Sequence, residues 1–312
     1  MKSLSIIIPT ANDLIRLSLT LSSICFQSID LKLIEVIVIN KPSDKTPHEL
    51  ISLFKNILDI RLFTQKNTSR SEARNIGLLE STGEIILFID DDLILTPDFI
   101  NHHLKHHNQA LEVVVIGEVK NLYFSDLKIH FKSILDDPFD NDWYFSKLNW
   151  IENKSRPHPY FSLTRIPFIN TAINKIPWIG FGTNNSSVKK EHLLKINCFE
   201  ETYKGWGFDN IETGLRLYQN GLKYIYEPSA INYHLSHARN KEEHINEFQE
   251  NFNLFKKRNQ GNHIDYYWEF INGNLSVEEF NSRLSNQIPP DSCKQHFYKD
   301  YQNLLKWIEL SK

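Results

Sequence analysis

The sequence is short of cysteine, of long apolar runs and of excess charge, and each shortage excludes a class of protein. Its three cysteines, Cys25, Cys198 and Cys293, are too few and too widely spaced for a zinc motif or a disulfide framework, which favours a reducing compartment. No apolar stretch approaches the roughly 20 residues that span a bilayer. The net charge of -3 argues against an electrostatic nucleic-acid binder. We expect a cytoplasmic protein, free or peripheral to a membrane, with no nucleic-acid partner and no transmembrane segment.

Strands and helices alternate in the first third of the chain. Predicted strands cover residues 4–8 (ending at Pro9), 34–39, 60–63 and 85–89, and predicted helices cover residues 13–28, 48–58 and 71–79. Such alternation is typical of βαβ units and a mostly parallel sheet. The pattern therefore predicts the nucleotide-binding half of a doubly wound α/β fold.

The rest of the chain divides into an irregular middle and a helical end. Residues 120–180 are rich in proline, asparagine and aromatics, and we interpret them as a solvated loop, with an acceptor-side lid as the alternative. A helix is predicted within 205–222. Beyond Arg239 the pattern favours charged, amphipathic helices at 242–258, 277–284 and 296–310, the second of them preceded by a capping box with Ser276 as the cap. These helices form a predicted appendage, through which copies of the chain would associate.

Three consecutive carboxylates, Asp90, Asp91 and Asp92, follow the apolar run at residues 85–89. Open α/β sheets bind their ligands at the carboxyl ends of strands. Adjacent carboxylates repel one another, and burying one without a partner costs several kcal/mol. A bound cation is the simplest explanation, and oxygen ligands on a short loop suit Mg²⁺ or Mn²⁺. A solvated acidic turn is the alternative.

Four segments stand in a fixed order along the chain: Ser-Ile-Ile-Ile-Pro-Thr at 5–10, Glu-Val-Ile-Val-Ile-Asn at 35–40, Ser-Glu-Ala-Arg-Asn-Ile-Gly at 71–77 and Phe-Ile-Asp-Asp-Asp at 88–92. Together they resemble the family 2 glycosyltransferases of the GT-A fold. The resemblance implies a GT-A domain at 1–239, with a nucleotide-binding half at 1–118 and an acceptor half at 119–239. Residues 240–312 would be the helical C-terminal appendage.

The resemblance also implies the substrates and the donor site. The donor would be a nucleotide sugar, expected to be a UDP-sugar, and the acceptor a carbohydrate, a peptide or a lipid-linked sugar. Residues expected to contact the nucleotide sugar are Pro9, Thr10, Asn40, Arg74, Asp90, Asp91 and Trp206. Asn40 stands where the family usually has an aspartate against uracil, and the alternative for Arg74 is a solvated helical arginine.

The metal ligands implied by the resemblance are Asp90, Asp92 and His234, with His237 as second choice for the histidine. They would hold Mn²⁺ or Mg²⁺ against the diphosphate. Four histidines at 102, 103, 106 and 107 also invite a zinc interpretation. Because no cysteine or acidic partner completes that set, a solvated helix face is the preferred interpretation.

The catalytic base is expected in Gly-Trp-Gly-Phe-Asp-Asn-Ile-Glu at 205–212, which resembles the Trp-Gly-x-Glu-Asp motif of related enzymes. Asn210 stands where inverting relatives often carry the aspartate base, and an amide cannot accept that proton. The alternatives, in order, are Asp209 as base, a retaining mechanism, and Glu212 as base. A degenerate protein that binds nucleotide sugar without turnover is a further alternative, whereas a haloacid dehalogenase-type phosphatase is disfavoured because Ile94 replaces the threonine it requires.

Overall fold

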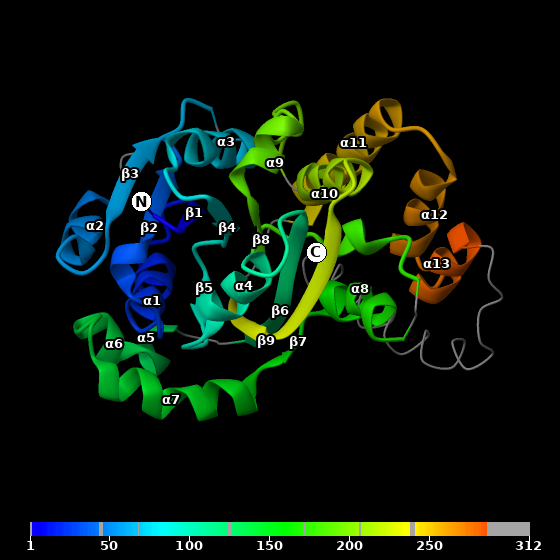
Figure 1. Cartoon of the computed structure of the whole chain (residues 1–312). Helices are drawn as coiled ribbons and strands as arrows, with labels where there is room; N and C mark the ends of the chain where they lie inside the picture. The colour runs from blue at the N-terminus through cyan, green and yellow to red at the C-terminus, as the bar shows by residue number, and fades with distance from the viewer. Residues whose placement is uncertain are drawn as a thin grey trace.

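The computed structural model describes residues 2–43, 46–67, 69–123, 127–170, 173–205, 207–237 and 241–285, with the side chains of 241–245 excepted. The described part contains one mixed nine-stranded sheet, ordered β3-β2-β1-β4-β8-β6-β9-β5, with β7 paired to β6 (Figure 1). The strands are β1 (Leu4–Thr10), β2 (Ile34–Asn40), β3 (Ile60–Thr64), β4 (Ile85–Phe88), β5 (Leu93–Leu95), β6 (Val113–Tyr123), β7 (Arg156–Pro157), β8 (Ser186–Lys189) and β9 (Lys223–Ser236).

Helices flank this sheet, and Figure 1 shows a separate group of them, α11 to α13, beside α10. The α-helices are α1 (Leu14–Cys25), α2 (His48–Phe54), α3 (Arg70–Glu80), α4 (Phe99–His107), α5 (Leu127–His130), α6 (Lys132–Asp136), α7 (Asn141–Lys154), α8 (Pro159–Asn170), α9 (Lys190–Lys195), α10 (Asp209–Gln219), α11 (Lys241–Arg258), α12 (Asn262–Ile271) and α13 (Val277–Ser285), and two short 3₁₀ segments are η1 (Leu31–Leu33) and η2 (Pro177–Gly180). Within the described residues no helix combines the length and the apolar character that crossing a bilayer requires.

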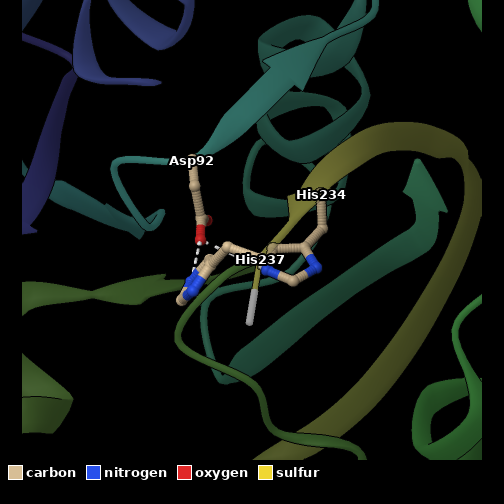
Figure 2. Close-up of side chains that lie close together, drawn as sticks. All are labelled: Asp92, His234 and His237. Atoms are coloured by element: carbon tan, nitrogen blue, oxygen red, sulfur yellow. Dashed lines mark ion pairs between the residues drawn. The ribbon is translucent and has the colours of Figure 1, made fainter. Parts of the chain in front are cut away.

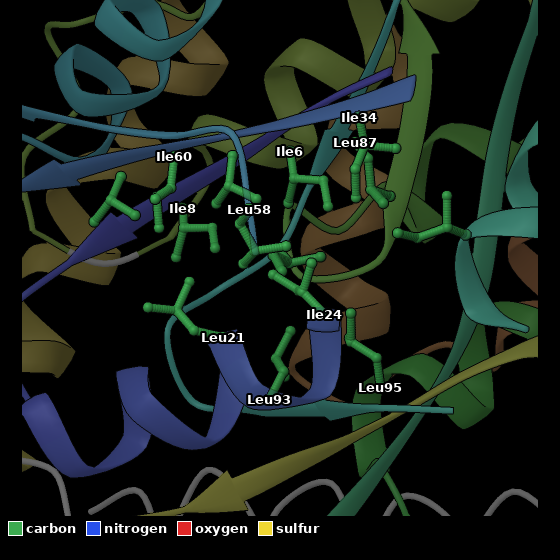
Figure 3. Packing of buried hydrophobic residues seen from close by; sticks show 14 of the residues in the cluster. Ile6, Ile8, Leu21, Ile24, Ile34, Leu58, Ile60, Leu87, Leu93 and Leu95 are labelled. Carbon is green, nitrogen blue, oxygen red and sulfur yellow. The ribbon is translucent and has the colours of Figure 1, made fainter. Parts of the chain in front are cut away.

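The first four strands pair in parallel, as the alternating pattern predicts. Side chains of a strand alternate between its two faces, so each β-branched run supplies two cores. On one face Ile6, Ile8 and Leu87 pack with Leu21 and Ile24 of α1 (Figure 3). On the opposite face the intervening strand residues, among them Ile7, Ile37 and Phe88, pack under α3 and α9. The parallel part of the sheet is therefore covered by apolar side chains on both faces.

The sequence predicted that the first strand ends at Pro9, and this is wrong, because β1 continues to Thr10. The Ile7 carbonyl accepts from the Ile89 N–H, so residue 7 faces β4, and residue 9 faces the same side. Pairing with β4 stops at Ile7, whereas pairing with β2 runs to Thr10. The missing N–H of Pro9 therefore costs no ladder bond.

The middle of the chain is largely helical, so its interpretation as a solvated loop is wrong. Helices α6 and α7 bury Tyr144, Ile134 and Ile151 in a small core against β9. Proline and asparagine are compatible with these helices because they lie mainly at the ends and on exposed faces. The exception is Pro167 inside α8.

The C-terminal helices α11 to α13 pack into one core with α8, η2 and α10. Phe252 and Phe255 of α11 are buried in this core and lie against Phe208. The capping box before α13 is also confirmed, because Ser276 and Glu279 exchange backbone-to-side-chain hydrogen bonds of 3.1 Å. The predicted helix at 296–310 lies outside the described residues, and association of copies through this region stays a prediction.

Glu35, a buried residue of β2, ties the early strands together. Its carboxylate accepts from the Ser5 hydroxyl, from Arg61 and from the backbone N–H groups of Thr82 and Gly83. Burial opposes ionisation, but the hydrogen bonds from Ser5, Thr82 and Arg61 outweigh it and lower the pKa of Glu35 to about 2. Its ionised form is therefore stabilised by the fold.

We predict that Glu35 contributes on the order of 3 kcal/mol to folding at neutral pH. Because the pKa is lower in the folded state, this contribution is present above the ordinary value of 4.5 and is lost as the pH falls toward about 2. Urea unfolding at neutral and acid pH should show that Glu35→Gln lowers neutral stability and removes this part of the acid dependence. The exposed Glu49→Gln is the control, and equal curves for both variants would contradict the prediction.

Candidate functional site

The predicted acidic loop joins β4 to β5 at the carboxyl edge of the parallel strands. Two backbone bonds hold it: the Leu93 N–H donates to the Thr20 hydroxyl at 2.9 Å, and the Asp92 carbonyl accepts from the Leu235 N–H at 2.8 Å. The second bond links the loop to the end of β9. Asp92 is buried, so the solvated alternative for this residue is wrong.

Two histidines face the carboxylate of Asp92 (Figure 2). Its Oδ2 atom lies 3.2 Å from Nε2 of His234 and 3.3 Å from Nε2 of His237. Burial would raise the pKa of Asp92, but the charges and hydrogen bonds of the two histidines outweigh it and hold that pKa far below its usual value. The carboxylate is therefore ionised and ready to act as a ligand.

These three side chains fit a divalent cation. One carboxylate oxygen and two imidazole nitrogens lie within 4.8 Å of one another. A six-coordinate ion with ligands at about 2.1 Å places neighbouring ligand atoms about 3 Å apart, close to the two measured separations. The second oxygen of Asp92, Oδ1, is buried and has no hydrogen-bond partner among the described residues. The site can thus hold a metal, with His234 placed by β9 and His237 by the residue that directly follows this strand.

The other two aspartates have different surroundings. Asp91 accepts from the Thr10 hydroxyl at 2.5 Å, so the end of β1 contacts the loop as expected for a shared site. Burial, together with the charge of Asp92, raises the pKa of Asp91 to about 7. Asp90 is about 39% exposed and its Oδ1 lies 3.8 Å from the guanidinium of Arg74. Asp90 is not part of the three-residue cluster, and its role as a ligand stays a prediction.

Arg74 is buried, so its interpretation as a solvated arginine is wrong. Its guanidinium donates to Oδ2 of Asp209 at 2.6 Å and packs over the ring of Phe199 at 5.7 Å. Since Arg74 comes from α3 and Asp209 from the start of α10, the ion pair joins two segments 135 residues apart. Arg74 therefore lies between the acidic loop and the predicted catalytic segment.

Three of the remaining predicted site residues form hydrogen bonds with other parts of the protein. Both oxygens of Glu212 are bound by Arg216, at 2.9 and 2.7 Å. The Asn210 amide donates to the Phe181 carbonyl at 3.3 Å. Asn40, at the end of β2, accepts from the Thr64 hydroxyl at 2.7 Å. Trp206 lies outside the described residues.

The four histidines of α4 do not form the solvated face that the sequence predicted. His103 and His107 are buried and share the hydroxyl of Ser187, at 2.9 and 2.8 Å. His106 contacts Glu227 at 2.7 Å. Ser187 follows some 80 residues later, on a strand whose pairing the local pattern does not reveal. These histidines therefore belong to the contact between α4 and the sheet.

A family model described as glycosyl transferase family 2 matches residues 5–165, more than half of the chain. The chain belongs to this family. A second model, described as the N-terminal domain of galactosyltransferase, matches residues 169–241. The resemblance found in the sequence motifs is thereby confirmed. Both models together cover the sheet and the whole of the candidate site.

Two relatives illustrate the sequence similarity. The uncharacterized glycosyltransferase YfnE of Bacillus subtilis (strain 168) is 27% identical over 258 residues, which cover 76% of this chain and 65% of YfnE. The validoxylamine A glucosyltransferase of Streptomyces hygroscopicus subsp. jinggangensis (strain 5008) is 23% identical over 282 residues, which cover 88% of this chain and 66% of that protein. The chain thus spans just under two thirds of the length of each.

Solved structures of TarS from S. aureus share the fold. TarS 1-349 in complex with UDP gives a TM-score of 0.60 at 16% identity, and the match covers 100% of this chain and 83% of the TarS 1-349 chain. Its complex with UDP-GlcNAc gives a TM-score of 0.59 at 15% identity, with 99% and 80% covered. The predicted GT-A fold, with a helical C-terminal region, is confirmed.

We predict that the Arg74–Asp209 pair is a major structural contact. Arg74→Met leaves the Asp209 carboxylate buried without its partner, which should lower the free energy of unfolding by about 3–5 kcal/mol. Adding Asp209→Leu should recover part of the loss in urea unfolding. Arg283→Met breaks the exposed pair with Glu269 and should cost less than about 1 kcal/mol. An Arg74 variant as stable as this control would contradict the prediction.

Proposed function

We propose that this protein transfers a sugar from a nucleoside-diphosphate sugar, specifically a UDP-sugar, to a glycan, peptide or lipid-linked acceptor, with Mn²⁺ or Mg²⁺. The observation that carries the proposal is the cluster of Asp92, His234 and His237 at the carboxyl edge of the sheet. Asp92 lies on the acidic loop, which Thr10 and Arg74 also contact. The complexes of TarS with UDP and with UDP-GlcNAc support the choice of donor.

The reaction separates charge, because the diphosphate leaves as an anion. A divalent ion at this site would neutralise that anion as a Lewis acid. Asp92, His234 and His237 would hold the ion, with Asp90 contributing to it or to the ribose. Because Asp92 is buried and backbone-anchored at both the loop and β9, it would bind without rearrangement, which is the condition for electrostatic stabilisation.

The ends of the parallel strands would bind the nucleotide. Pro9 and Thr10 end β1, and Asn40 ends the adjacent β2 in the same register. The nucleotide base would lie against this edge, beside Asp91, whose carboxylate accepts a hydrogen bond from Thr10. Trp206 would also contact the nucleotide sugar. Arg74 would set the position of Asp90 and Asp209 relative to each other.

For the catalytic base we propose Asp209 ahead of Glu212. Both oxygens of Glu212 are held by Arg216, whereas one oxygen of Asp209, Oδ2, is held by Arg74. Asp209 would accept the proton of the acceptor hydroxyl as that oxygen attacks the anomeric carbon. The amide Asn210 next to it favours a second candidate, a retaining mechanism. Assigning the anomeric configuration of the product by NMR decides between the two.

We also propose that residues 1–118 bind the nucleotide, that residues 119–239 bind the acceptor, and that residues 240–312 form the appendage. Helices α11 to α13 share a core with α8 and α10, on which the predicted base lies. We therefore propose that the appendage supports the acceptor side. A non-catalytic sugar-binding protein, favoured by Asn210, is the remaining candidate, and UDP release with acceptor present decides against it.

We predict that Asp92→Ala lowers donor turnover by about 100-fold or more, since it removes the central ligand of the site. UDP release from a panel of UDP-sugars with Mn²⁺ measures turnover, and calorimetry measures UDP binding with and without a chelator. Wild-type binding should weaken on chelation, and binding to the variant should be insensitive to it. Asp98→Ala, an exposed residue nearby, is the control. Full turnover by Asp92→Ala in chelator would eliminate the proposal.

We also predict that His234 matters more than His237 for metal binding. Their distances to Asp92 are nearly equal, but the side chain of His234 is about 10% exposed and that of His237 about 37%. A buried, hydrogen-bonded ring loses less conformational freedom on binding. The Mn²⁺ concentration for half-maximal UDP release should rise more in His234→Ala than in His237→Ala. The reverse order would assign the principal histidine to His237.

A further inference from the structure

Asn121 lies opposite His234 in the pairing of β6 with β9. The two strands run parallel, with Asn121 and His234 in register, after a bulge at Gly117 and Glu118. Asn121 is fully buried. Its amide oxygen lies 3.0 Å from Nδ1 of His234, and its Nδ2 donates to the hydroxyl of Tyr123 at 3.1 Å. Both ends of this buried amide are therefore engaged.

This arrangement determines which ring nitrogen of His234 is free to bind. Because Nδ2 of Asn121 is directed at Tyr123, the amide oxygen faces the ring and can only accept a hydrogen bond. Nδ1 of His234 must then carry the hydrogen. Without a cation, Nε2 can carry a hydrogen that it donates to Asp92, 3.2 Å away; a bound cation would take the place of that hydrogen on the Nε2 lone pair of the neutral imidazole.

We propose that Asn121 is a positioning residue for the metal site, which fixes His234 as the Nδ1–H tautomer and presents Nε2 to a divalent cation. The inference rests on the proposed metal site and deepens it. Histidine ligands commonly donate their other N–H to a buried acceptor, which sets the ring orientation and strengthens the ligand. Here the acceptor comes from a strand 113 residues earlier in the chain.

The test compares Mn²⁺ affinity in two variants of Asn121, measured by EPR titration of free Mn²⁺ without any substrate. Asn121→Leu has a similar volume and no acceptor, and it should weaken Mn²⁺ binding by about 10–100-fold. Asn121→Asp restores an acceptor and should bind at least as tightly as the wild type, within a few-fold. Loss in the first variant and rescue in the second support a tautomer role.

A buried asparagine in another core provides the matched control. Asn281 is buried on α13 and donates to the Ile173 carbonyl. Asn281→Leu should lower the melting temperature as Asn121→Leu does, while leaving Mn²⁺ affinity unchanged. Equal Mn²⁺ affinity in Asn121→Leu and wild type would overturn the inference and leave the metal site standing. A wild type that binds no Mn²⁺ would overturn both.

A measurement on the wild type keeps the inference testable if Asn121→Leu does not fold. Long-range ¹H–¹⁵N NMR of the Mg²⁺-loaded protein, with the His234 signals assigned from His234→Gln, reports which nitrogen carries the hydrogen. We expect a protonated Nδ1 and an unprotonated Nε2. A protonated Nε2 in the loaded protein would overturn the proposed role of Asn121.

Discussion

A carboxylate taken out of water has to be paired, and this constraint organises one end of the protein around Asp92. An unpaired buried charge costs several kcal/mol, so the fold must bring donors to it. It does so with β9, a 14-residue strand that lies along β6 and carries His234 to the acidic loop, while His237 follows directly after the strand. The same strand anchors the Asp92 carbonyl through the Leu235 N–H. The position of β9 beside β6 thus sets both the position of the acidic loop and the position of the histidine ligand His234.

The need to pair buried charges also brings α3 and α10 together. Arg74 and Asp209 are both buried, and each would be costly without the other. Their pairing places the start of α10, with its aspartate and Asn210, beside the acidic loop. The candidate site is therefore assembled from segments far apart in sequence, because each buried charged side chain needs a partner of opposite charge from another segment. Hydrophobic burial positions the sheet and helices, and ion pairs between buried charged groups position the side chains of the candidate site.

The sequence predicted features of the fold and of the candidate site that depend on residues close together in the chain, and missed several that depend on distant partners. The strand at 85–88, helix α3 and the capping box of Ser276 and Glu279 follow from spacing within a few residues, and all were predicted. The burial of Arg74 depends on a partner 135 residues away, and the burial of His103 on Ser187. Local patterns carry no record of such partners. The continuation of β1 through Pro9 likewise depends on where the neighbouring strand stops pairing.

Two buried carboxylates in this chain show how a structural acid differs from a candidate ligand. Glu35 accepts from the Ser5 and Thr82 hydroxyls, from Arg61 and from two backbone N–H groups, so both oxygens are satisfied within the fold. Asp92 is buried to a similar degree, yet its Oδ1 has no partner in the described part of the chain, and its Oδ2 faces two imidazoles. A carboxylate that served folding alone would be expected to resemble Glu35, because an unsatisfied buried acceptor costs about 1–3 kcal/mol. At Asp92 this cost falls on the loop where the sheet edge, the two histidines and Arg74 meet, and a cation bound there would offset it.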